Sequence, residues 1–203
     1  MSDGLYRKAL GLEYFTVGYN VLEGVLAIVA GILAGSIALV GFGLDSAVES
    51  SSGSVIIWRL TRHGKVSPEE EERVERIAVR LVGVSFFLLG AYVFFESVRK
   101  LYLMEAPEPS LFGIGIAATS VIVMPVLSRA KLKTAREMGS RSLAADSKQT
   151  FICTLLSVAL LVGLGLNYLF GLWWADPAAA LVIVFFIIRE GIESFREDKL
   201  CAC

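Results

Sequence analysis

The sequence predicts an all-α membrane protein whose six transmembrane helices form a single domain. Two observations indicate this class. Hydrophobic residues make up 55% of the 203-residue chain and charged residues only 19%, against about 25% charge in a typical soluble domain. The charges also gather in a few patches, which leaves long apolar tracts between them. A membrane β-barrel would instead show segments of about ten residues with alternating hydrophobicity.

Six apolar tracts are long enough to cross a bilayer, which takes a helix of about 20 mostly apolar residues. These tracts cover residues 11–34, 36–58, 77–98, 110–128, 143–170 and 174–194. Only a short turn of small residues, ending at Ser36, separates the first two tracts. We therefore expect them to form a tight helical hairpin.

Three segments carry the residues that favour a helix start. Ser67 is followed by Pro68 and a run of glutamates, which is typical of a capped helix N-terminus. The third helix should therefore begin before it enters the membrane. Ser110 and Asp176 are expected to cap the fourth and sixth helices in the same way.

The distribution of lysine and arginine predicts the orientation, because cytoplasmic loops carry the excess of these residues. With both termini cytoplasmic, the outer loops hold only Arg99 and Lys100. We therefore expect an integral, multi-pass protein of a cell or inner membrane. One transmembrane domain covers residues 1–203, with a short tail at 195–203. No cleavable signal peptide is evident, and a net charge of −1 argues against a nucleic-acid partner.

The cysteines and the one histidine predict little chemistry outside the membrane. Cys153 lies in an apolar tract, whereas Cys201 and Cys203 end the chain, so no disulfide framework is implied. The two terminal cysteines could deliver metal or be acylated, although an unstructured end is the simpler expectation. His63 lies in a charged loop and is expected to be solvated.

Two carboxylates lie inside the second apolar tract, in the stretch GLDSAVESSSG. Asp45 and Glu49 are four residues apart, so they share one face of a helix. A carboxylate at such depth costs about 2.5–3.5 kcal/mol on insertion scales, and two together repel each other. A divalent cation would offset this cost. The alternatives are protonation or a buried arginine that pairs with them.

A second polar cluster lies in the fifth tract, in LAADSKQTFIC. Gln149 and Cys153 are four residues apart, and Asp146 precedes Gln149 by three, so all three can share one face. Two helices that each offer a pair one turn apart can build a four-ligand metal cage. Cys153 could instead be a small buried hydrophobe and Gln149 a helix-to-helix hydrogen-bond partner. Asp146 could be a gate or could pair with Lys148 or Arg141.

Three further acidic or polar residues are weaker candidates for the same cavity. Asn20 and Glu23 are three residues apart on the first helix and could face the metal. A polar contact within the bundle is the alternative. Asp176 fits a helix cap better than a metal ligand.

The hairpin YNVLEGVLAIVAGILAGSIALVGFGLDSAVESSSG resembles that of the cation diffusion facilitator family, whose members export divalent metals, usually in exchange for protons. The family turn with Ser-x-Ala-Leu appears here as GSIAL, and its pair of acids as Asp45-x-x-x-Glu49. Ala145-Asp146 matches the opening of the family motif on the fifth helix, and Asp176-Pro177-Ala178 matches the start of the sixth. The resemblance covers all six tracts. It implies a six-helix bundle that works by alternating access.

This chain departs from the family pattern in its ligands and its length. The family histidine falls on Gln149 and the second aspartate of that motif on Cys153. The cytoplasmic metal-binding domain that usually follows the sixth helix and helps the family to dimerise is not expected here. The resemblance then implies a homodimer formed through the membrane helices, with the third as the candidate.

The combined ligand set of two carboxylates, one amide and one thiol suits Zn²⁺ first, with Mn²⁺, Fe²⁺, Co²⁺ or Cd²⁺ as alternatives. No prosthetic group is expected. Two other functions stay open: a metal-binding membrane protein with a regulatory role and no transport, and a proton-coupled exporter of another solute. An enzyme is not expected, because no nucleophile and base pair and no HExxH motif is present.

Overall fold

The computed structural model describes residues 3–34, 37–63, 65, 67–104 and 111–199, and it confirms an all-α protein. No strand occurs among these residues. Six helices follow one another along the chain: α1 (Asp3–Ala34), α2 (Ile37–Arg62), α3 (Pro68–Leu103), α4 (Leu111–Met138), α5 (Arg141–Phe170) and α6 (Ala175–Lys199).

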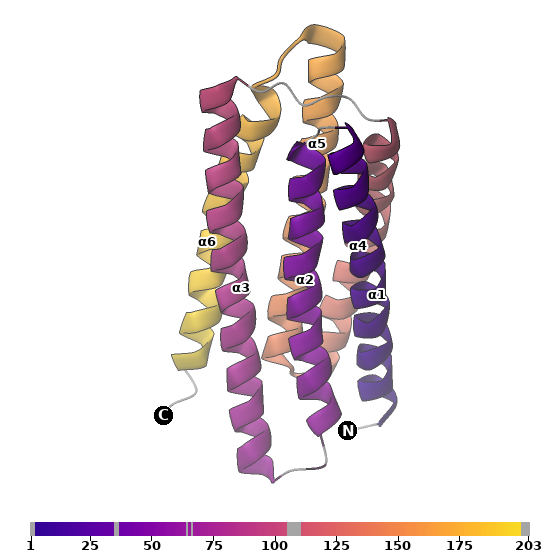
Figure 1. Ribbon diagram of the computed structural model, residues 1–203. Coiled ribbons are helices and arrows are strands. Elements are labelled where there is room, and N and C mark those ends of the chain that lie inside the picture. Colours follow the sequence, from indigo (N-terminus) through magenta and orange to yellow (C-terminus); the bar gives the residue numbers. More distant parts are fainter. Residues whose placement is uncertain (1–2, 35–36, 64, 66, 105–110, 200–203) are drawn as a thin grey trace.

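The helices run side by side in one elongated bundle (Figure 1). The main packing pairs are α1 with α2, α3 with α6, and α4 with α5. The helices α1, α2, α4 and α5 form one group through further α1–α4 and α2–α5 contacts, and α3 joins it through α2 and α5. An even number of helices returns the chain to its starting side. Both ends therefore lie toward the same end of the bundle, called the terminal end below (Figure 1).

The outer surface of the bundle is apolar, as expected of an integral multi-pass membrane protein. Within the described residues, α1, α3, α4 and α5 are long and apolar enough to cross a membrane by length and composition. Large side chains such as Leu33, Phe95 and Ile122 are more than half exposed. An apolar surface of this kind is unfavourable in water, whereas lipid chains solvate it.

Several helices extend beyond the predicted apolar tracts. The start of α3 is as expected: Ser67 is the N-cap, and its side chain accepts a hydrogen bond from the backbone N–H of Glu70. The helix α4 continues ten residues past the predicted end, to Met138. This extension matters for the site, because it carries Lys131.

Two expected helix caps need separate comment. Asp176 does not cap α6: the helix begins at Ala175, and the Trp174 carbonyl accepts the hydrogen bond from the N–H of Ala178. The helix starts two residues earlier than a cap at Asp176 would require, which places Asp176 in the first turn. Ser110 and the turn at Ser36 lie outside the described residues.

Small residues let α1 and α2 approach closely beside the two acids of α2. A Cβ atom on Gly43 would lie 2.8 Å from the backbone oxygen of Gly24 and 2.6 Å from Cγ1 of Ile28. Real Cβ atoms do not come so near to a backbone oxygen, so only glycine allows this helix spacing. The contact fixes α2 against α1 two residues before Asp45.

The terminal end of the bundle is held by a buried carboxylate. Glu75 of α3 accepts hydrogen bonds from the backbone N–H of Ser142 (2.9 Å) and from the hydroxyls of Ser140 (3.1 Å) and Ser142 (3.0 Å). It also pairs with Arg59 of α2. Gly139, at φ +67°, ends α4 in the left-handed conformation that favours glycine. These contacts set where α5 begins.

The prediction that His63 is merely solvated was wrong. Its ring stacks on Tyr6 of α1, with centroids 3.5 Å apart, and it pairs with Glu71 of α3. Sequence reasoning treated the charged segment as a free loop, whereas α1 and α3 both begin before the apolar tracts and supply the partners of His63.

Candidate metal centre

The structure brings together three of the four predicted ligands in the interior of the bundle. Asp45 and Glu49 are buried on the inner face of α2, and Cys153 is buried on α5. The Cys153 thiol lies within hydrogen-bonding reach of both carboxylates. The spacing of four residues on α2 therefore places two acids on the face that α5 covers.

Gln149 lies one turn before Cys153 on the same helix and is fully buried. Its Oε1 accepts a hydrogen bond of 2.9 Å from the Ser85 hydroxyl of α3, and its Nε2 has no hydrogen-bond partner. A half-turn of the amide would let Nε2 donate to Ser85 and would free Oε1 as a ligand. The amide can thus serve a metal without losing its contact to α3.

Unpartnered polar atoms gather around these side chains. Oδ1 of Asp45, Oε1 of Glu49 and both side-chain polar atoms of Asn20 are buried without a hydrogen bond. A buried polar atom without a partner costs about 1–3 kcal/mol, and native structures contain few of them. Their concentration here indicates a place where a partner from outside the protein can bind.

The arrangement is not a preformed metal cage. Within the part of the chain that the structure describes, no three His, Cys, Asp or Glu side chains converge as metal ligands. Asp45 and Glu49 are separated by one turn of α2. The charges and the donor atoms are in place, whereas the coordination geometry is not.

The two weaker candidates on α1 differ in their surroundings. Glu23 accepts hydrogen bonds from the hydroxyls of Tyr19 (3.0 Å) and Ser46 (3.1 Å). This is the contact within the bundle that the sequence left open as an alternative. Asn20 is fully buried, and neither polar atom of its side chain has a hydrogen-bond partner, so it stays the better candidate on this helix.

Asp146 belongs to a separate ion-pair network. Its Oδ1 accepts a hydrogen bond from Ser52 (2.5 Å) and its Oδ2 from the Lys131 ammonium (2.6 Å). The partners that the sequence suggested are engaged elsewhere: Lys148 pairs with Glu193 (3.6 Å) and Arg141 with Glu72 (2.7 Å). Both oxygens of Asp146 are thus in use.

Lys131 and Glu13 are the important residues that sequence reasoning missed. Both are fully buried, and Lys131 Nζ lies 3.1 Å from Oε2 of Glu13. Lys131 stands among Arg129, Lys133 and Arg136, a pattern that indicates a solvated loop. A signal was present, because Ser128, Lys131, Ala135 and Met138 recur at helical spacing and form one buried face.

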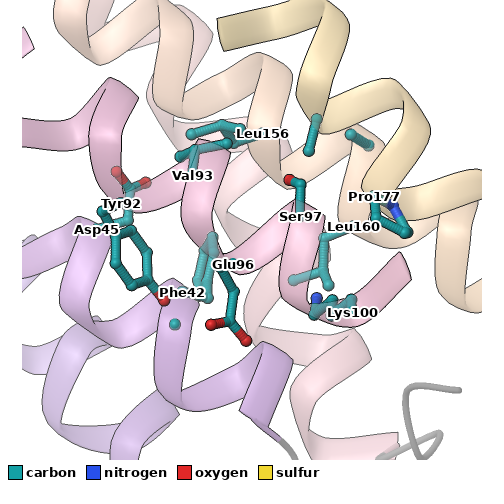
Figure 2. A pocket seen from close by; sticks show the side chains of 13 residues that line it. Phe42, Asp45, Tyr92, Val93, Glu96, Ser97, Lys100, Leu156, Leu160 and Pro177 are labelled. Atoms are coloured by element: carbon teal, nitrogen blue, oxygen red, sulfur yellow. The ribbon is translucent and has the colours of Figure 1, made fainter. Parts of the chain in front are cut away.

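A pocket of about 80 Å³ reaches Asp45 from the side opposite the terminal end. It lies among α2, α3, α5 and α6. Figure 2 shows Asp45 beside Tyr92 at one end of the pocket, with Glu96 and Lys100 further along α3. The volume is enough for a few water molecules. Asp45, one carboxylate of the pair, therefore lines this cavity.

Comparison with known proteins gives the family. The chain matches the family described as the cation efflux transmembrane domain over residues 15–200. It therefore belongs to the cation efflux, or cation diffusion facilitator, family, and the resemblance seen in the α1–α2 hairpin is confirmed. Members of this family are multi-pass membrane proteins that transport metal cations.

Three relatives illustrate the range of the similarity. Transmembrane protein 163 of Xenopus laevis is 20% identical over 92% of this chain and 66% of its own length. A cadmium, cobalt and zinc/H⁺–K⁺ antiporter of Bacillus velezensis is 24% identical over 97% of this chain and 63% of its own. Metal tolerance protein 4 of Oryza sativa subsp. japonica is 28% identical over 84% of this chain and 44% of its own length. The chain thus spans at most about two thirds of the length of these relatives.

Proposed function

We propose that this protein moves a divalent transition-metal ion across the membrane by alternating access, and that Asp45, Glu49, Gln149 and Cys153 bind the ion in transit. The observation that carries the proposal is the buried pair of acids: each has one unpartnered oxygen, and the Cys153 thiol lies within hydrogen-bonding reach of both carboxylates. The pocket that reaches Asp45 supplies a route to one side. The family supplies the class of cargo.

Charge balance favours a dication over other cargoes. Two ionised carboxylates one turn apart carry a charge of −2 in the interior of the bundle. Each attraction to a unit positive charge about 4 Å away is worth about 4 kcal/mol at an effective dielectric constant of 20, and a dication doubles it. A single divalent ion therefore neutralises the pair, whereas a neutral solute would leave the repulsion in place.

The donor set favours a borderline metal. The Cys153 thiol, ionised when it coordinates, prefers soft ions, and the two carboxylates prefer hard ones. Zn²⁺ accepts both kinds of ligand in a tetrahedral arrangement, so it is our first choice, with Cd²⁺ and Co²⁺ next. The name of the Bacillus velezensis relative includes the same three metals.

We infer that protons replace the metal at the same carboxylates. Two acids confined together in a poorly solvated site do not both stay ionised without a counter-cation. Proton uptake after metal release would restore neutrality. The name of one relative includes proton exchange, and the site here contains no histidine to carry the proton.

We also propose a homodimer formed through the membrane helices, with α3 as the contact. Its outward face is apolar, with Leu88, Phe94 and Phe95 more than half exposed. Such a face can contact either lipid or a second α3. Cross-linking of single cysteines on this face in membranes would test the dimer independently of transport.

One other function fits the same site. A membrane protein that binds metal for regulation, without moving it, is favoured by Gln149 at the place of the family histidine and by the absence of a preformed cage among the described residues. It differs from a transporter in one measurable respect: it binds metal but gives no flux.

The test uses purified protein in liposomes that contain a zinc-sensitive dye. Parent protein should give Zn²⁺ flux, and Glu49→Gln should reduce it at least tenfold, because one negative charge of the pair is lost. Glu137→Gln, on the exposed face of α4, is the matched control and should leave the flux unchanged. Equal flux in parent and Glu49→Gln would reject the site, and binding without flux in the parent would favour the regulatory role.

A further inference from the structure

A fully enclosed ammonium lies on the terminal side of the candidate metal site. Lys131 of α4 donates to Oδ2 of Asp146 (2.6 Å) and to the Thr150 hydroxyl (3.3 Å), and it pairs with Oε2 of Glu13 (3.1 Å). None of its side chain is exposed. Glu13 is on α1, whereas Asp146 and Thr150 are on α5. One side chain from α4 thus joins three helices in the interior.

The fourth helix of the group joins the same network. Ser52 of α2 donates to the other oxygen of Asp146. Gly53 beside it has no side chain, and a Cβ there would lie 3.1 Å from Oε2 of Glu13 and 2.8 Å from Cγ2 of Val17. The backbone of α2 therefore leaves space for the Glu13 carboxylate. The network is built into the packing of the bundle and is not a chance contact of long side chains.

The Lys131 ammonium can neutralise only one of the two carboxylates. With both Glu13 and Asp146 ionised, the network would carry a net charge of −1. Oε1 of Glu13 is buried without a hydrogen-bond partner. When both acids are ionised, they can therefore accept one positive charge more than Lys131 supplies. A dication would satisfy both acids where the ammonium satisfies them only in part.

The network is adjacent to the Asp45–Glu49 pair. Ser52 follows Glu49 by one turn of α2, and Asp146 and Thr150 flank Gln149 on α5. Lys131 interacts electrostatically with Glu49, and the Thr150 hydroxyl lies within hydrogen-bonding reach of Glu49. A cation that approaches the pair from the terminal end would meet the carboxylates of Glu13 and Asp146 first.

We propose that Lys131 is a tethered cation that fills a second divalent-cation site built from Glu13 and Asp146. Its ammonium lies 2.6 and 3.1 Å from the two acids, and carboxylates bind Zn²⁺ at about 2.0–2.2 Å. Each oxygen therefore needs to close by only about 1 Å or less to hold a metal ion in place of the ammonium. The Thr150 and Ser52 hydroxyls lie beside it as further oxygen ligands.

The same ammonium separates the metal centre from the terminal end. Asp45 lines a pocket on the opposite side, whereas Lys131 and its partners lie next to Glu49 toward the terminal end. The second site stands on its own geometry. Lys131 would also act as a gate if the metal passes this second site, because an ion bound between Glu13 and Asp146 has to displace Lys131; this role rests on the proposed transport function.

The test is a substitution that removes the ammonium and keeps the length of the side chain. Lys131→Met is made in a Glu49→Gln background, in which the Asp45–Glu49 pair is already disabled. Bound Zn²⁺ is measured by equilibrium dialysis and mass spectrometry on the full chain in detergent. The thermal midpoint is measured with and without Zn²⁺. Lys133→Met, exposed two residues further along α4, is the matched control.

We expect Lys131→Met to bind one additional Zn²⁺ per chain and to unfold at a lower temperature unless Zn²⁺ is present. The additional ion should be lost in the triple variant Glu13→Gln, Lys131→Met, Asp146→Asn, and the thermal midpoint of that variant should no longer respond to Zn²⁺. Lys133→Met should match its background in both measurements.

The proposal is overturned if Lys131→Met folds and binds no additional Zn²⁺. It is equally overturned if Lys131→Met fails to fold and Zn²⁺ does not restore its fold. It is also overturned if the triple variant still binds the additional ion. The outcome is independent of the transport proposal. If the Asp45–Glu49 pair binds no metal, Glu49→Gln alone will bind the same number of Zn²⁺ ions per chain as the parent protein. Lys131→Met in that background will still bind one Zn²⁺ ion more.

Discussion

Replacing Glu75 with glutamine should destabilise the bundle far more than an equally conservative change at its surface. The substitution keeps the size of the side chain and one oxygen acceptor but removes the charge that pairs with Arg59. Arg59 is 8% exposed, so it would be left as a nearly buried charge without its partner. Breaking such a buried pair costs about 3–5 kcal/mol.

The hydrogen bonds at the start of α5 add to this loss. The Glu75 carboxylate accepts three of them, from Ser140 and twice from Ser142. A glutamine oxygen can keep two at most, and its NH₂ group cannot accept any. Hydrogen bonds to a charged group contribute about 1.5–3 kcal/mol each and neutral ones about 1. We therefore take about 4 kcal/mol as the expected loss, at the middle of the range for a broken buried pair.

The assay is unfolding of the detergent-solubilised protein, followed by circular dichroism. Glu72→Gln is the control, because Glu72 is about half exposed and forms a similar ion pair with Arg141 (2.7 Å). An exposed pair contributes about 0–1 kcal/mol. Equal losses for Glu75→Gln and Glu72→Gln would refute the view that the buried contact fixes the terminal end of the bundle.

Two further predictions concern the helix contact and the metal. Gly43→Ala should destabilise the protein by about 1–3 kcal/mol through overpacking against α1, whereas Gly115→Ala, with open space around it, should be neutral or stabilising. Equal unfolding midpoints for the two variants would contradict this. Cys153→Ser replaces a soft ligand with a hard one, so it should lower the ratio of Cd²⁺ to Mn²⁺ affinity at least tenfold in competition dialysis. An unchanged ratio would exclude the thiol as a ligand.

The helices and the inner face of α2 could be predicted because each follows from a local pattern. Long apolar tracts predict helices in a membrane, and a spacing of four residues places Asp45 and Glu49 together whatever the rest of the bundle does. Ser67 and the acidic run after it fixed the start of α3 equally well. In these cases the physical cause lies within a few residues of the feature.

Lys131 could not be placed in this way, because its burial depends on three other helices. Its own segment is rich in basic residues, and the apolar tract ends before it. Glu13 and Asp146 are 118 and 15 residues away along the chain, and only the packing of α1 and α5 against α4 brings them to it. The stacking of His63 on Tyr6 was missed for the same reason.

The most direct test of a metal site between α2 and α5 is a structure of the protein with bound Zn²⁺, located by its anomalous X-ray signal. We predict a peak about 2.0–2.3 Å from oxygens of Asp45 and Glu49 and from the sulfur of Cys153. A well-occupied peak elsewhere, with these side chains placed as they are without metal, would contradict the proposed site.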